Sequence, residues 1–303
     1  MNLWLTPDGR LRAGWRALSG CILAYLANWV AVMVAATAPV NRPRLFEAIY
    51  RPTAMLLFLV VFSLLLLVLD QVQGNPLPAM GLGWGARGLR LALTGLLLGG
   101  VMIGLVMPVL ALWGQLSLRL HLTPHAFLQA LAELYILATG AMAEELVFRG
   151  YPLQRCMEGA GTVLGMVIMS LLFGAVHLAN PNASVLGFVN TVGVGLLLSL
   201  AYVRTRSLWL PWGIHLGWNA ALGMAFGLPV SGLTDFAVLV RGMARGPHWL
   251  TGGAYGIEAG AAGSGAIVLG CAAVILITRK SDGTKTAVGR WHLALGHRER
   301  INP

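Results

Sequence analysis

The sequence predicts an all-α, polytopic membrane protein with about eight transmembrane helices. Hydrophobic residues make up 57% of the 303 residues and charged residues only 11%. The mean hydropathy of +0.74 lies far above the range of soluble globular proteins. The apolar residues also form long runs, which are typical of transmembrane helices.

Eight apolar segments are expected to form these helices. They cover residues 14–38, 53–69, 89–114, 126–148, 161–178, 184–203, 208–228 and 260–277. The fifth is near the lower length limit for a membrane span, and the eighth is rich in Gly and Ala, which suits close helix packing. We expect a single transmembrane domain, residues 1–278, followed by a basic cytoplasmic tail, residues 279–303.

The basic residues indicate an orientation in the membrane. The net charge of +10 could suggest nucleic acid, but the basic side chains lie in loops and tails and form no patterned patch. We therefore expect membrane lipids and no nucleic acid as partners. Eight helices would place both termini on one side with 15 of the 21 Lys and Arg residues. The positive-inside rule then places both termini in the cytoplasm, with the chain multi-pass in the inner (plasma) membrane.

A few polar residues fall inside the apolar segments. Three of the 11 acidic residues, Glu133, Glu144 and Glu145, lie in the fourth segment, His177 lies in the fifth and His215 in the seventh. Because a carboxylate is costly to bury in hydrocarbon, ionisable groups at membrane depth are usually functional.

Helical spacing groups some of these residues on common faces. Glu145 and Arg149 are four residues apart and can pair, whereas Glu144 is rotated by about 100° from Glu145. His215 and Asn219 are also four apart on one face. Glu133 lies close to three turns before Glu144 and is expected to be interfacial or to line the cavity.

The fourth and fifth segments are expected to bring a glutamate and a histidine together. The turn between them is "EGAG" at 158–161, with Glu144 16 residues before Ala160 and His177 17 residues after it. If both arms are helical and antiparallel, the two side chains lie level at roughly 24 Å from the turn. Pro152 is placed to kink the first arm.

These side chains could together hydrolyse an amide. A carboxylate in a low-dielectric site can take a proton from water, and a neighbouring histidine can share the water and pass a proton to a leaving amine. A second histidine with an asparagine can donate hydrogen bonds to the developing oxyanion.

Three short motifs resemble those of a known family. "EELVFRG", "FGAVH" and "HLGWN" are similar to the EExxxR, FxxxH and HxxxN motifs of the CPBP family, the CAAX proteases and bacteriocin-processing enzymes. The connecting "LAYVRTRSLWLPWGIH" also resembles this family. The resemblance covers about residues 125–228, which we expect to be the catalytic core.

The resemblance implies a fold and a role for each motif residue. It implies an eight-helix, CAAX-protease-like intramembrane endopeptidase acting on membrane-bound protein or peptide substrates. Glu144 would be the base that activates water with His177 as its partner. His215 and Asn219 would form the oxyanion hole, and Glu145 and Arg149 would support and orient the site.

The resemblance also implies a glutamate protease without cofactor. The sequence has no HExxH and no CxxC among its three cysteines. Zinc on Glu144, His177 and His215 is the alternative left open.

Two other functions are alternatives to the protease. One is a non-enzymatic scaffold or bacteriocin-immunity protein of the same fold, disfavoured because all six motif residues are present. The other is a proton-coupled transporter, because intramembrane Glu and His also form proton relays. It is disfavoured because the chain shows no inverted repeat.

Overall fold

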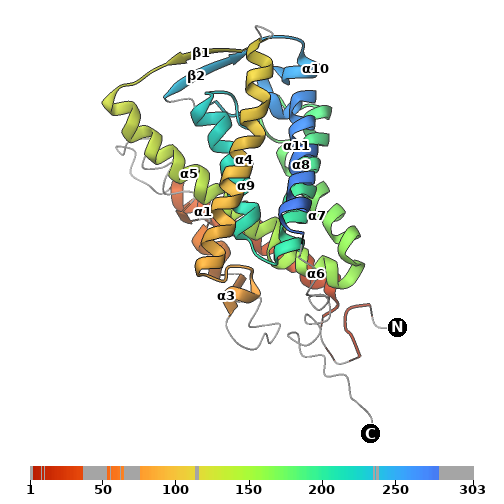
Figure 1. Ribbon diagram of the computed structural model, residues 1–303. Helices are drawn as coiled ribbons and strands as arrows, with labels where there is room; N and C mark the ends of the chain where they lie inside the picture. Colours follow the sequence, from red (N-terminus) through yellow and green to blue (C-terminus); the bar gives the residue numbers. More distant parts are fainter. Residues whose placement is uncertain are drawn as a thin grey trace.

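The structure, a computed structural model, is built almost entirely of helices (Figure 1). It describes residues 3–7, 9, 11–36, 76–112, 116–234, 236 and 239–279 and most of 53–64. The expected second segment, 53–69, therefore lies partly outside the described residues, and the expected tail lies outside them beyond residue 279.

The described helices follow the expected apolar segments closely. In chain order they are α1 (Ala13–Ala36), α3 (Pro76–Ala79), α4 (Ala86–Leu112), α5 (Pro124–Arg149), α6 (Tyr151–Ala160), α7 (Thr162–His177), α8 (Val185–Thr205), α9 (Trp209–Ala220), α10 (His248–Thr251) and α11 (Ala261–Ile277). The turns η1 (Ala221–Ala225, π-helical), η2 (Gly253–Tyr255) and η3 (Ile257–Ala259, both 3-10) connect them after α9.

The all-α membrane class is confirmed, but the number of eight spans is not. Within the described residues, three helices are long and apolar enough to cross a membrane, at Ala86–Leu112, Pro124–Ala160 and Val185–Thr205. Shorter apolar helices cover Thr162–His177 and Ala261–Ile277. Figure 1 shows α4, α8, α9 and α11 side by side along the long axis, while α5 crosses them obliquely.

The predicted end of the seventh helix, at residue 228, is wrong. α9 stops at Ala220, and η1 follows it. The chain then turns through Gly227, which has φ +60°, and a Cβ there would lie 1.9 Å from the carbonyl oxygen of Val240. This close approach, followed by Pro229, ends the helix before residue 228.

A two-stranded antiparallel ribbon was not expected from the sequence. β1 (Leu116–Leu120) pairs antiparallel with β2 (Val240–Ala244), with Leu116 opposite Ala244. The two strands are short and far apart in the chain, so no local pattern links them. The ribbon closes the end of the molecule where α4 finishes (Figure 1).

A one-residue break between α5 and α6, at Gly150, lies two positions before Pro152, where a kink was expected. α5 ends at Arg149, and Pro152 lies in the first turn of α6, where its missing N–H is tolerated. The expected turn at 158–161 is confirmed, because α6 ends at Ala160 and Gly161 has φ +84°.

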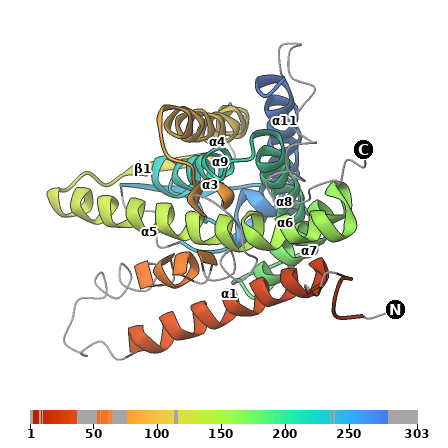
Figure 2. The same ribbon diagram turned by 90° about the horizontal axis from the view of Figure 1, so that it is seen from below.

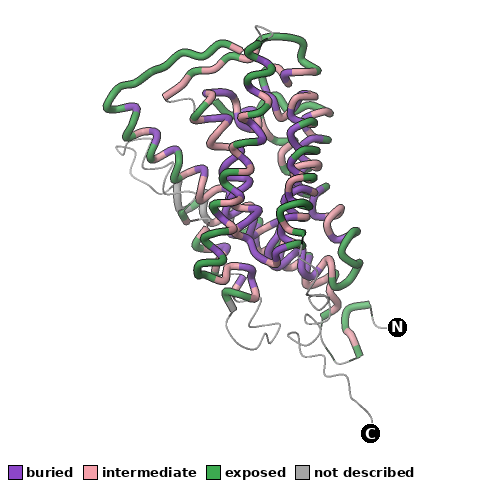
Figure 3. The backbone as a smooth tube through the Cα atoms, viewed as in Figure 1, coloured by how far each residue is buried: buried purple, intermediate pink, exposed green. Residues whose placement is uncertain are grey.

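α9 is held in place by an unusually close contact with α4. Gly213 and Gly217 of α9 face Ala92 and Leu96 of α4, and a Cβ on either glycine would lie 2.3 or 2.2 Å from a carbonyl oxygen there. Small residues permit such backbone contact between membrane helices. Figure 2 shows α5 between α1 on one side and α4 with α9 on the other. The buried residues run through this middle region (Figure 3).

Candidate active site

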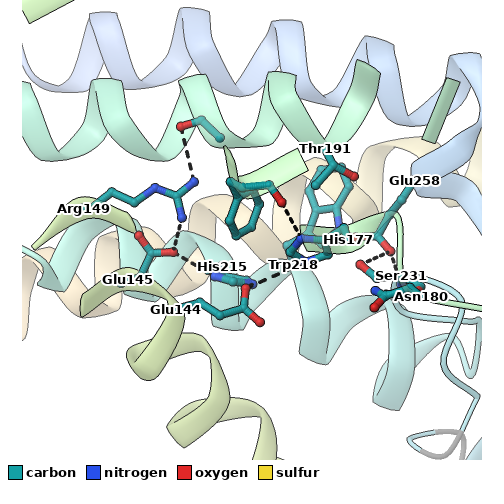
Figure 4. Close-up of polar contacts among 12 residues, drawn as sticks. Glu144, Glu145, Arg149, His177, Asn180, Thr191, His215, Trp218, Ser231 and Glu258 are labelled. Carbon is teal, nitrogen blue, oxygen red and sulfur yellow. Dashed lines mark hydrogen bonds and ion pairs between the residues drawn. The ribbon is translucent and has the colours of Figure 1, made fainter. Parts of the chain in front are cut away.

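Five of the six motif residues come together where α5, α7 and α9 meet, as Figure 4 shows for Glu144, Glu145, Arg149, His177 and His215. α5 supplies Glu144, Glu145 and Arg149 from its last two turns, and α7 supplies His177 from its last turn. His215 lies in the middle of α9, and Asn219 follows one turn later. The tertiary structure thus gathers all six predicted residues into one region.

Glu145 is the buried centre of a network of charged groups. Its Oε1 accepts a hydrogen bond of 3.2 Å from Arg149 Nη1 and lies 2.9 Å from His215 Nδ1. The side chains of Glu145 and Arg149 are 0% and 1% exposed. Since both are sequestered from water, the network is a fixed part of the framework. The expected Glu145–Arg149 pair is confirmed, whereas the link to His215 was not foreseen.

Arg149 also ties α5 to the neighbouring helices. Its Nη2 donates to the carbonyl oxygen of Gly195 in α8 at 3.3 Å. Its guanidinium carbon lies 4.3 Å from the ring centroid of Phe173 in α7, a cation–π distance. The arginine therefore joins α5, α7 and α8.

Glu144 faces both histidines. Its Oε2 lies 3.9 Å from His177 Nε2 and 3.8 Å from His215 Nε2. Among the described groups this oxygen is buried without a hydrogen-bond partner. Separations of this size are too long for direct hydrogen bonds but fit two polar groups bridged by one water. The expected approach of Glu144 to His177 is confirmed.

The orientation of His177 follows from its second ring nitrogen. Nδ1 lies 2.7 Å from the carbonyl oxygen of Phe173, one turn earlier. Because a carbonyl can only accept, Nδ1 carries the hydrogen, and in the neutral ring Nε2 is left as an acceptor that faces Glu144.

A small cavity adjoins these groups. Its volume is about 30 Å³, and its lining includes His177, His215, Asn219, Trp218 and Glu258. The side chain of Asn219 forms no hydrogen bond within the described part of the chain, so its side-chain amide is available to a ligand. Glu133 is 8% exposed and does not line this cavity.

Sequence reasoning missed Glu258, a carboxylate that lines this cavity together with the two histidines. It lies in η3, directly before the last apolar helix. Its Oε1 accepts from Trp218 Nε1 at 2.9 Å, and its Oε2 accepts from the backbone N–H and, at 3.2 Å, the Oγ of Ser231. Burial raises the pKa of the Glu258 carboxyl, while these hydrogen bonds and nearby His177 oppose the shift. The sequence did carry a signal for it, because Glu258 is one of only 11 acidic residues and lies in an apolar context.

Within the described part of the chain, no group of three or more His, Cys, Asp and Glu side chains has the arrangement of a metal site. A metal-free reaction remains a prediction that a chelator can test.

The fold and the site together define a class of membrane-embedded protein with a glutamate–histidine centre. Residues 125–221 match the family model described as "Rce1-like: Type II CAAX prenyl endopeptidase Rce1-like". This segment is thus a domain of the CPBP/CAAX protease family, which confirms the membership predicted from the three motifs. The match includes α9 with His215 and Asn219 and leaves α1, α4 and α11 outside it. No curated protein and no solved structure matches the chain.

Proposed function

We propose that this protein is an intramembrane endopeptidase that hydrolyses peptide bonds of membrane-associated protein or peptide substrates. One observation carries the proposal. The Oε2 of Glu144 lies 3.8–3.9 Å from the Nε2 of two histidines, in a site backed by a buried Glu–Arg pair.

The first chemical step is the activation of water. A water between Glu144 and His177 gives a proton to the carboxylate as its oxygen attacks the scissile carbonyl carbon. The carbonyl π electrons move onto the oxygen and form a tetrahedral oxyanion. His177 is suited to this role because the Phe173 carbonyl fixes its ring with Nε2 toward Glu144.

The second step is the stabilisation of the oxyanion and its collapse. His215, with hydrogens on both ring nitrogens, donates from Nε2, and Asn219 donates from its side-chain amide. When the C–N bond breaks, the proton taken from water passes through Glu144 or His177 to the leaving amine. The products are a carboxylic acid and an amine, and no co-reactant other than water is needed.

Glu145 and Arg149 position these groups without contacting the substrate. The 2.9 Å contact of Glu145 with His215 Nδ1 fixes the direction of Nε2. Arg149 in turn holds Glu145 and is itself held by Gly195 and Phe173.

We further propose that the reaction uses no metal. Glu144, His177 and His215 could in principle hold zinc instead, which would polarise the carbonyl and activate the water. A chelator distinguishes the two mechanisms: activity should survive EDTA, whereas complete loss restored by zinc would establish the metal.

The substrates and location follow from the setting of the site. A site among apolar helices is reached most directly by segments that are anchored in or bound to the bilayer. We propose that the protein spans the inner (plasma) membrane with both ends in the cytoplasm, as the distribution of basic residues predicts.

A non-enzymatic scaffold or immunity protein is the second candidate, and a proton-coupled transporter the third. A scaffold would not need a carboxylate aimed at two histidines, or an asparagine amide available at the same cavity. A transporter remains chemically compatible with intramembrane Glu and His.

The deciding experiment compares cells that express wild type or Glu144→Gln, using mass spectrometry of new protein termini in their membranes. The exchange is nearly isosteric, so insertion and folding should persist while the base is lost. Termini that appear only with wild type would support the protease and identify substrates.

Asn219→Ala should reduce turnover of such a substrate by about 10²–10³, the usual effect of one oxyanion donor. Normal turnover by Glu144→Gln would contradict the proposed mechanism. Identical termini from two well-folded proteins would favour the scaffold.

A further inference from the structure

Glu258 is a charged residue at the cavity to which the motifs assign no role. It lies in η3, outside the matched segment 125–221. Its carboxylate nevertheless lines the same cavity as His177, His215 and Asn219.

Glu258 joins segments that are distant in the sequence. One carboxylate oxygen accepts from Trp218 near the end of α9. The other accepts from Ser231, in a turn of the chain after η1. Asn180, three residues after His177, donates to the carbonyl oxygen of Ser231 at 3.1 Å. The carbonyl of Glu258 accepts from Asn190 of α8 at 2.8 Å. The ends of α7 and α9 are thus connected through one carboxylate and one serine (Figure 4).

The contacts of Glu258 lie next to the irregular end of α9. α9 loses its regular hydrogen bonding directly after Asn219 and Ala220, where the π-helical turn begins. Local departures of this kind often mark functional sites because they re-aim side chains. Ser231 itself has φ +49°, an uncommon conformation for a residue other than glycine. The contacts of Ser231 therefore help to hold this backbone conformation.

We propose that Glu258 is a positioning residue of this active site, which clamps Trp218 and the Ser231 turn and thereby fixes the direction of the adjacent Asn219. The inference rests on the proposed function, because Asn219 matters only if an oxyanion forms. Glu258 acts through Asn219 and does not itself exchange protons with the substrate.

The carboxylate chemistry explains why glutamate is needed. Both oxygens act as acceptors, one for the indole N–H and one for the Ser231 N–H and hydroxyl. In Glu258→Gln, one oxygen is replaced by an NH₂ group, which cannot accept from the donor it faces. Either Trp218 or Ser231 must then lose its partner.

The first test separates positioning from general support by enzyme kinetics. With a substrate identified as above, Glu258→Gln should lower kcat by up to about 100-fold, the effect of a small misplacement in an active site, with KM changed little. Adding Glu258→Gln to Asn219→Ala should cause almost no further loss, because the donor that Glu258 positions is already gone. Multiplicative losses in the double variant would overturn the proposal.

Glu158→Gln is the matched control. Glu158 pairs with Arg16 and Arg155 at the far end of α6, away from the cavity. The same chemical exchange there should leave kcat and KM unchanged. If Glu258→Gln does not fold, Trp218→Phe, which keeps an aromatic ring and removes the N–H donor, replaces it in the same cycle.

The second test does not depend on activity. Hydrogen exchange of purified wild type and Glu258→Gln should show faster exchange in residues 218–234 of the variant, with α4 unchanged. Unchanged exchange at 218–234 would overturn the clamp even if cleavage is observed. Faster exchange together with an inactive wild type would support the clamp and contradict the protease proposal instead.

Discussion

At the residue scale, one buried carboxylate connects the framework of the site to its chemistry. Glu145 serves Arg149 on one side and His215 on the other through the same oxygen. Glu144, its neighbour in the chain, points to the two histidine Nε2 atoms instead. The two adjacent glutamates therefore contact different groups, because they lie about 100° apart around the helix.

Arg149→Met should destabilise the fold strongly. The side chain is similar in length but leaves the buried Glu145 without its cationic partner on α5. Breaking a buried pair in this way typically lowers the free energy of unfolding by about 3–5 kcal/mol. Unfolding in detergent measures the loss. Arg90→Met, at an exposed arginine of α4, is the control and should change stability by only about 0.5 kcal/mol; equal losses would contradict a special role for the buried pair.

Glu258 should make stability depend on pH in a definite direction. Burial raises its pKa in the folded protein above the ordinary value of a glutamate side chain. The titratable groups that face it are His177 and Tyr255. A raised carboxyl pKa contributes stability that is fully present below the unfolded pKa and is lost as pH rises through the folded pKa.

The free energy of unfolding of wild type should therefore fall relative to that of Glu258→Gln as pH increases from about 4.5. Detergent unfolding of both proteins at several pH values measures it. A difference that stays constant with pH, or moves the other way, would contradict the shift.

At the element scale, the short helix α9 carries both proposed oxyanion donors, and α4 determines where it lies. The two helices approach so closely that four glycines, Gly95, Gly99, Gly213 and Gly217, face carbonyl oxygens of the other helix. α4 lies outside the matched family segment, yet its position decides where His215 and Asn219 point.

Gly213→Ala should reduce both stability and turnover. The new Cβ would lie 2.3 Å from the carbonyl oxygen of Ala92, which is backbone and cannot rotate away. Overpacking of this kind costs typically about 1–3 kcal/mol, and the resulting shift of α9 would misplace His215. Thermal unfolding and the cleavage assay measure the two effects.

Gly100→Ala on α4 is the matched control, because a Cβ there meets nothing within 4 Å. It should leave activity intact and, through better helix propensity, add up to about 1 kcal/mol. Parallel losses in both variants would show that the α4–α9 contact is not responsible.

At the scale of the whole molecule, the helices define two ends. The end of α8 lies beside the chain after α11, since Arg204 bonds Thr278, and α1 reaches α6 through Arg16 and Glu158. The opposite end carries the β1–β2 ribbon (Figure 1). Our proposed orientation places the first end in the cytoplasm and the ribbon outside.

Cysteine labelling tests this orientation. Ser117→Cys in β1 and Trp84→Cys before α4 are both at exposed positions, in a background without Cys21, Cys156 and Cys271. A membrane-impermeant maleimide added to intact cells should label the first and spare the second, which should react only after permeabilisation. The reverse pattern would invert the topology and move the predicted tail outside.

The sequence by itself determined the features that depend on local geometry. Hydropathy predicted the membrane class, and Gly161 with Pro152 indicated the turn and the helix break between α5 and α7. The fixed rise of a helix was enough to bring Glu144 level with His177 across one turn. The roles of the six motif residues remain predictions, although the family they indicate is confirmed.

Only the tertiary structure decided the contacts between segments distant in the chain. It gave Glu145 a second partner in His215, paired β1 with β2, and brought Glu258 to the cavity from outside the motif region. It also ended α9 early, where Gly227 meets the backbone of β2. Periodicity describes one element at a time, whereas these contacts depend on how side chains of several helices pack together.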